Sequence, residues 1–89
     1  MQTFLKDPSD KLDYVVDFSN LLTPTDTILS VQITTSGSAS VSSYAVDGQK
    51  VVVFVEGGTA GQSSTISVKV TTNEGRALER SFRVLTVEM

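Results

Sequence analysis

The sequence contains no cysteine, no histidine and no tryptophan among its 89 residues. Without cysteine no disulfide bond can hold the fold, and without cysteine and histidine the usual ligands of transition metals are missing. Hydrolytic triads and most proton relays use a histidine as the base, so the serines have no evident partner. We therefore expect no catalytic residues, no cofactor and no metal site, in a protein that is not an enzyme.

Long apolar runs are also missing. The longest one, Val51–Val55, is far shorter than the roughly 20 residues needed to span a bilayer. The opening residues, MQTFLKDPSD, lack the apolar core of a signal peptide. The net charge is −3, whereas nucleic-acid binding depends on clustered Lys and Arg. We expect a chain that binds neither membranes nor nucleic acid.

Two kinds of ligand chemistry remain open. Calcium takes carboxylate oxygens, but the spacing of the aspartates matches no EF-hand and suits a solvent-exposed face. A glycine-rich phosphate cradle needs a helix N-terminus or a nearby lysine, whereas the glycines of Gly57–Gly61 lead into a predicted strand. We therefore assign these glycines to a turn. The aspartates considered for calcium are Asp7, Asp10, Asp13, Asp17 and Asp26.

Alternation of apolar and polar residues predicts β-strands along most of the chain. Its β-branched residues pack well on a pleated surface and lose rotamer freedom in a helix. A single helical turn is the exception, expected between Ser19 and Pro24. The residues expected to face inward are Leu12, Tyr14, Val16, Phe18, Leu29, Val31, Ile33, Ile66, Val68, Val70, Leu78, Phe82 and Val84.

Turn signals separate these strands. Asp47 and Gly48 predict a hairpin with a type I′ turn, in which both central residues have positive φ. The following strand, Lys50–Glu56, is apolar on both faces, which is typical of a strand buried on both sides. Asn73–Gly75 predicts the last hairpin turn.

Six or seven short strands with regular turns predict an all-β fold, an immunoglobulin-like antiparallel β-sandwich, with a small barrel as the alternative. At this length we expect one domain over residues 1–89, with residues 1–11 as an N-terminal arm or an edge strand. The core is expected to bury Phe18, Val31, Phe54, Val68 and Phe82.

Two stretches resemble a small protein family of tailed bacteriophages. Phe4–Ile28 carries a lysine-aspartate-proline segment, an L-D-Y strand and a loop that ends in T-D-T-I. Gly57–Val84 carries a G-G-T-A-G turn, an alternating strand, a glycine turn and E-R-S. Both are similar to the opening and closing patterns of the phage fiber-tail adaptor proteins, which are small virion components with an immunoglobulin-like fold.

The resemblance implies a mechanical role in the virion. The chain would be a structural adaptor, present in multiple copies, that links the tail or connector to a fiber or to neighbouring tail proteins. The alternative is an immunoglobulin-like decoration or carbohydrate-binding module on the virion surface, for which Phe4 and Tyr44 are the exposed aromatic candidates. The residues expected to contact other virion proteins are Phe4, Leu5, Leu21, Leu22, Thr25, Gly57, Gly58 and Thr59.

The two leucines of the loop Leu21–Thr27 leave two interpretations open. Adjacent exposed leucines often mark an interaction surface, so the loop would dock a partner. Alternatively, both leucines tuck under the sandwich and close its open end.

Overall fold

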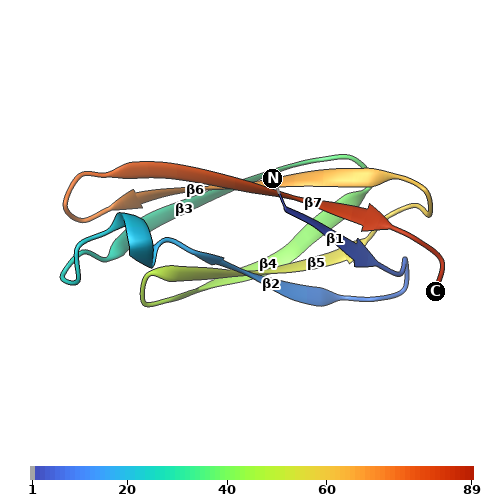
Figure 1. Ribbon diagram of the computed structural model, residues 1–89, viewed down its shortest axis with the longest axis horizontal. Helices are drawn as coiled ribbons and strands as arrows, with labels where there is room; N and C mark the ends of the chain where they lie inside the picture. Colours follow the sequence, from blue (N-terminus) through green and yellow to red (C-terminus); the bar gives the residue numbers. More distant parts are fainter. Residues whose placement is uncertain (1) are drawn as a thin grey trace.

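The structure is a computed structural model that describes residues 2–89; Met1, where the expected N-terminal arm begins, lies outside the described residues. Two β-sheets pack face to face in a body of 43 × 18 × 18 Å (Figure 1). The elements follow in the order β1 (Gln2–Lys6), β2 (Leu12–Asp17), η1 (Ser19–Leu21), β3 (Ile28–Ser36), β4 (Ala39–Asp47), β5 (Lys50–Gly57), β6 (Ser63–Thr72) and β7 (Ala77–Thr86).

The strand order is β1-β7-β6-β3 in one sheet and β2-β5-β4 in the other. This topology confirms the all-β sandwich of two sheets, with seven strands in the described chain, and is consistent with an immunoglobulin-like fold. One pair departs from the antiparallel expectation, because β1 runs parallel to β7. The chain leaves β1 for the other sheet through a loop, so β1 and β7 are not joined by a hairpin and can point the same way.

The core lies between the sheets and is built by the predicted alternation. On β2 the side chains of Tyr14 and Val16 are buried, while Val15 between them is exposed. Buried and more exposed side chains alternate in the same way along β5, β6 and β7, because successive side chains of a strand point to opposite faces. The buried hydrophobic cluster consists of Tyr14, Val16, Phe18, Ala39, Val51, Val53, Val55, Ile66, Val68, Val70, Phe82 and Val84.

The expected inward position of Leu29 is wrong. The register of β3 against β6 shifts between Ile28 and Ser30, so Leu29 is the extra residue of a β-bulge and is 64% exposed. Ile28 takes the inward position and packs against the core. Val31, expected in the core, is only half-buried because β3 is the outer strand of its sheet.

The expectation that β5 is buried on both sides is also wrong. Val51, Val53 and Val55 point into the core, whereas Val52 and Phe54 lie half-buried on the outer face of the three-stranded sheet. No second layer of described chain covers that face. The run is apolar on both faces, so its composition could not indicate which set of side chains faces the core.

The β4–β5 turn lies one residue later than predicted. Asp47 pairs with Lys50, so the central residues of the turn are Gly48 and Gln49. Only Gly48 has positive φ, at 61°, which fits a type II′ turn rather than type I′. The expected helical turn is present as η1, which ends before Pro24. In residues 2–89 we find no helix that is long and apolar enough to cross a membrane.

Candidate docking surfaces

The residues expected to contact partners lie at two opposite ends of the sandwich (Figure 1). The loop pole consists of residues 18–27 with the turns at Gly48–Gln49 and Asn73–Gly75. The terminal pole consists of residues 7–11, 57–62 and 87–89. Leu21, Leu22 and Thr25 lie at the loop pole, and Gly57, Gly58 and Thr59 lie at the terminal pole. Phe4 and Leu5 lie on β1, at the edge of the four-stranded sheet and toward the terminal pole.

At the loop pole the two adjacent leucines have different environments. Leu21, the last residue of η1, is 42% exposed. Leu22 is half-buried and packs against the hydrophobic core. The loop therefore combines features of both interpretations, since Leu22 helps to close the end of the sandwich while Leu21 remains accessible.

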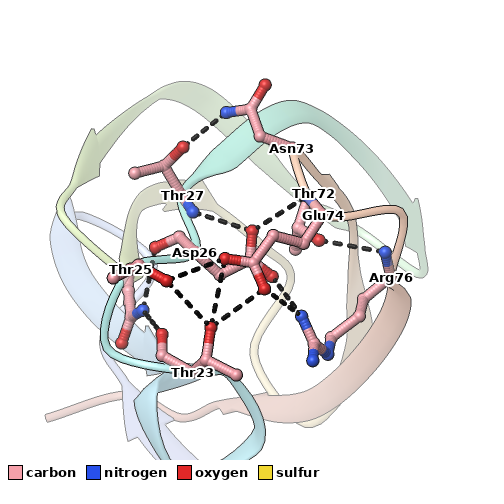
Figure 2. A network of polar contacts seen from close by, with 9 residues as sticks. Thr23, Thr25, Asp26, Thr27, Thr72, Asn73, Glu74 and Arg76 are labelled. Atoms are coloured by element: carbon pink, nitrogen blue, oxygen red, sulfur yellow. Dashed lines mark hydrogen bonds and ion pairs between the residues drawn. The ribbon is translucent and has the colours of Figure 1, made fainter.

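A buried carboxylate anchors this loop (Figure 2). The Asp26 side chain is fully buried, and its Oδ2 accepts a hydrogen bond from the guanidinium of Arg76 at 2.9 Å. Its Oδ1 accepts hydrogen bonds from the backbone amides of Thr27, at 2.9 Å, and of Glu74, at 3.1 Å. One side chain thus ties the loop to the β6–β7 turn.

Other polar groups complete the anchor. The Glu74 carboxylate accepts hydrogen bonds from the hydroxyls of Thr23 and Thr25, both at 3.0 Å. From the other sheet, Gln49 Nε2 donates to the backbone oxygens of Thr23, at 2.7 Å, and of Asp26, at 2.9 Å. The loop is therefore held by the hairpin turns of both sheets, and its exposed surface is preorganised for binding.

The same network perturbs the titration of the acidic groups. Burial alone would raise the pKa of Asp26, but hydrogen bonds from the Thr72 hydroxyl, the Glu74 amide and the Arg76 guanidinium outweigh it and hold that pKa below its ordinary value. The Arg76 guanidinium, with the hydroxyls of Thr25 and Thr23, lowers the pKa of Glu74. Both carboxylates therefore favour the folded state when they are ionised.

The anchor predicts a loss of stability in acid. A carboxylate with a lowered folded pKa stabilises the fold above its unfolded pKa, and this contribution disappears as the pH falls through the folded value. We expect the melting temperature to fall as the pH drops below roughly 4, where free Asp and Glu begin to protonate. Asp26→Asn should melt earlier at neutral pH and lose part of this acid dependence.

The control is Asp13→Asn, which removes an exposed carboxylate from β2. It should leave both the neutral melting temperature and its acid dependence close to those of the unmodified chain. An identical acid profile for Asp26→Asn and the unmodified chain would contradict the anchoring role of Asp26.

At the terminal pole a buried lysine joins the two sheets. Lys6 is fully buried at the end of β1, and its Nζ donates hydrogen bonds to the backbone oxygens of Gly57 and, at 2.8 Å, of Asp7. The Asp7 carboxylate in turn accepts hydrogen bonds from the amides of Ser9, at 2.8 Å, and Met89, at 3.0 Å. Lys6 and Asp7 together thus fix the loop after β1, the end of β5 and the C-terminal residues against one another.

The glycine turn follows directly on this lysine site. Gly58 lies against the side chain of the buried Thr86, and the Gly61 amide donates to the Thr86 oxygen at 2.7 Å. The exposed Thr59 is held through its amide, which donates to Ser38 Oγ at 2.8 Å. On the neighbouring edge strand, Leu5 is 58% exposed, whereas Phe4 is half-buried and stacks on Tyr14 and Phe82.

From the sequence we did not predict that Lys6, Arg76 and Gln49 would anchor the loops through hydrogen bonds. Asp26 was expected only as one of several aspartates on the surface. The five aspartates considered for calcium do not come together in one site. Asp7 lies at the terminal pole and Asp26 is paired with Arg76 at the loop pole. Throughout residues 2–89 no three His, Cys, Asp or Glu side chains come together as candidate metal ligands.

Residues 6–85 match the model of the family described as Podophage GP4 fiber-tail adaptor protein gp77. No curated protein matches the chain. The matched range contains the anchor residues Lys6, Asp26 and Arg76 and all the expected contact residues except Phe4 and Leu5. The resemblance read from the two quoted stretches is thereby confirmed.

Proposed function

This chain belongs to the podophage GP4 fiber-tail adaptor family, a family of structural virion components, and we propose that it joins a tail or connector protein at one pole to a fiber or neighbouring tail protein at the other. The observation that carries this proposal is the placement of the two anchored loop clusters at opposite ends of a body 43 Å long. Two ordered surfaces at opposite ends would let one chain contact two partners at the same time. The role is mechanical and needs no reactive group, cofactor, nucleic acid or membrane.

The loop pole offers the better defined contact. Leu21 is an apolar side chain on a backbone that Asp26 and Gln49 hold in place, so a partner can bury it without first ordering the loop. Thr25 lies exposed beside it, with its hydroxyl already bonded to Glu74. An apolar centre with a polar rim is the usual composition of a protein interface.

The terminal pole offers a second contact of a different kind. Leu5 is exposed on the edge strand β1, and Gly57, Gly58 and Thr59 form the adjacent turn. The turn presents backbone close to the surface, because its glycines carry no side chain. Each patch is small, so we expect the attachment to depend on many copies acting together.

Variants of the phage that encodes this chain test the proposal. Leu21→Ser and Leu5→Ser each remove one exposed apolar side chain, from the loop pole and from β1 respectively. Val15→Ser is the matched control, because Val15 is 59% exposed on β2, away from the loop pole. The protein composition of purified particles is measured by mass spectrometry, and the stability of each isolated variant by thermal melting.

We expect both isolated variants to keep their melting temperature and the two kinds of particle to lose different neighbours. Leu21→Ser should release the component bound at the loop pole, and Leu5→Ser the attachment on the other side. Particles of full composition from both variants would refute the proposed contacts. Loss of the same single neighbour in both would show that the chain binds at one end only.

A further inference from the structure

The outer strands of the two sheets, β3 and β4, lie on the same flank of the sandwich. Each pairs with one strand only within residues 2–89, β3 with β6 and β4 with β5. They are joined through Gly37 and Ser38 and line a common groove of about 600 Å³. We call this surface, made by the exposed residues of β3 and of β4 up to Val46, the β3–β4 flank.

This flank lacks the protection that edge strands normally carry. Natural edge strands are blunted by charged side chains, especially lysine, or by proline. From Thr27 to Val46 the sequence contains no charged residue and no proline. The opposite flank differs, since its groove between β1, β2 and β7 is lined by Asp17 and Arg80 among others.

The flank also leaves core-facing side chains uncovered. Tyr44 and Val46 pair with Val53 and Val51, whose side chains are fully buried, so all four belong to the inner face of their sheet. Yet Tyr44 is 49% exposed and Val46 is 46% exposed. The register of β4 shifts between Val41 and Ser43, and from that bulge to the end of β4 every residue is exposed.

We propose that the β3–β4 flank binds the same flank of a second copy of this chain about a two-fold axis. Burying an unpaired charge is costly, so the partner surface must itself be uncharged. The chain's own flank meets that requirement, whereas its opposite flank does not. Each copy carries a net charge of −3, so this neutral surface is where two copies approach with the least repulsion.

In a two-fold contact each residue meets the equivalent surface of its partner, so Tyr44 of each copy would enter the groove of the other. This inference goes beyond the adaptor role and does not rest on it. Failure of the particle experiments above would leave it standing, because it concerns the isolated chain alone.

Sedimentation equilibrium of the full chain over a range of concentrations tests the proposal. We expect a monomer–dimer equilibrium that salt leaves unchanged or strengthens, because salt screens the repulsion between the two acidic copies. Tyr44→Lys and Thr35→Lys each place a charge in the groove of the flank and should weaken dimerisation at least about tenfold, because burying an unpaired charge is costly. Val15→Lys, which places the same charge on an exposed position of β2, should not.

Thr35 is exposed on β3 and lines the groove, so its substitution keeps the test valid if the Tyr44 variant is unfolded in a thermal melt. An introduced cysteine gives an independent readout, because the chain has none of its own. Ser43→Cys, at the rim of the groove, should form a disulfide-linked dimer under mild oxidation, and Val15→Cys should not.

Three results would overturn the proposal. The unmodified chain could stay monomeric at concentrations up to about 1 mM, which would mean a dissociation constant for the dimer above about 1 mM. The Val15→Lys variant could weaken association as much as Thr35→Lys, which would indicate head-to-tail contacts between the two flanks. Finally, Thr35→Lys could dimerise as tightly as the unmodified chain, with Ser43→Cys failing to crosslink.

Discussion

Replacement of Phe82 by alanine should lower the free energy of unfolding by about 3 to 5 kcal/mol, the usual cost of truncating a buried aromatic side chain. Phe82 is 5% exposed on β7, and its ring packs edge-on against Phe4, with centroids 5.8 Å apart. The ring also lies 5.3 Å from that of Tyr14 on β2, which itself contacts Phe4. Three strands from two sheets therefore meet at this side chain, and the cavity left by alanine cannot close by moving one of them.

Chemical denaturation of the full chain measures this loss. Each kcal/mol corresponds to roughly 4 to 8 °C in the melting temperature of a domain of this size, so the thermal shift should exceed about 10 °C. A shift below a few degrees would show that the assigned inward face of β7 is wrong.

The matched control is Tyr14→Phe, which keeps the aromatic cluster and removes one hydroxyl. The Tyr14 hydroxyl is buried and has no hydrogen-bond partner in the described part of the chain. Burial, with a smaller effect of the Asp10 charge, raises the pKa of Tyr14. Removing an unsatisfied buried hydroxyl should leave stability unchanged or increase it by about 1 kcal/mol. A clear loss would mean that the hydroxyl has a partner.

The alternation of side chains was sufficient to predict most strands and most of the core. Tyr14 and Val16 on β2 with Phe18 directly after it, and Ile66, Val68 and Val70 on β6, are buried as predicted. The prediction failed where the phase of the alternation changes. The bulge at Leu29 reverses the orientation of one residue, and no residue type marks it, because it reflects how β3 fits its neighbour β6.

The predictions for Phe54 and for the β4–β5 turn were also wrong, since Phe54 was expected in the core and the turn one residue earlier. A run of valines around Phe54 gives no polar face from which to infer direction, so only the packing of the two sheets decides that Val53 points inward. The pair Asp47–Gly48 signalled a turn correctly, but the register of β4 against β5 shifts its centre to Gly48 and Gln49. Local sequence thus indicated the presence of a turn, and long-range pairing fixed its type.

The contact surfaces were less predictable than the fold. The loop with Leu21 could be identified from the sequence, but not the ion pair between the buried Asp26 and Arg76 that holds it. Those two residues are 50 positions apart, and they meet only because the β6–β7 turn folds against the loop after η1. For the same reason nothing local could indicate that Lys6 would reach the backbone of Gly57 in the other sheet.

Replacement of Gly58 by alanine should be the most damaging change at the terminal pole. Gly58 has φ of +105°, and an added Cβ would overlap the Thr86 hydroxyl and lie 3.2 Å from the Thr86 Cβ. Thr86 cannot easily move, because its amide donates to the Gln62 oxygen and its own oxygen accepts from the Gly61 amide. Left-handed backbone costs a residue with a Cβ roughly 1–2 kcal/mol, and overpacking adds about 1–3 kcal/mol.

Gly57→Ala separates the cost of the left-handed backbone from the cost of overpacking against Thr86. Gly57 also has positive φ, at 74°, but an added Cβ there meets no atom within 4 Å. We expect this variant to lose only the backbone contribution, so its denaturation midpoint should lie between those of Gly58→Ala and the unmodified chain. Equal losses in the two variants would mean that the turn relaxes away from Thr86. A turn that relaxes so readily could not serve as a preorganised contact, and Leu5 on β1 would then remain as the main candidate at that end of the molecule.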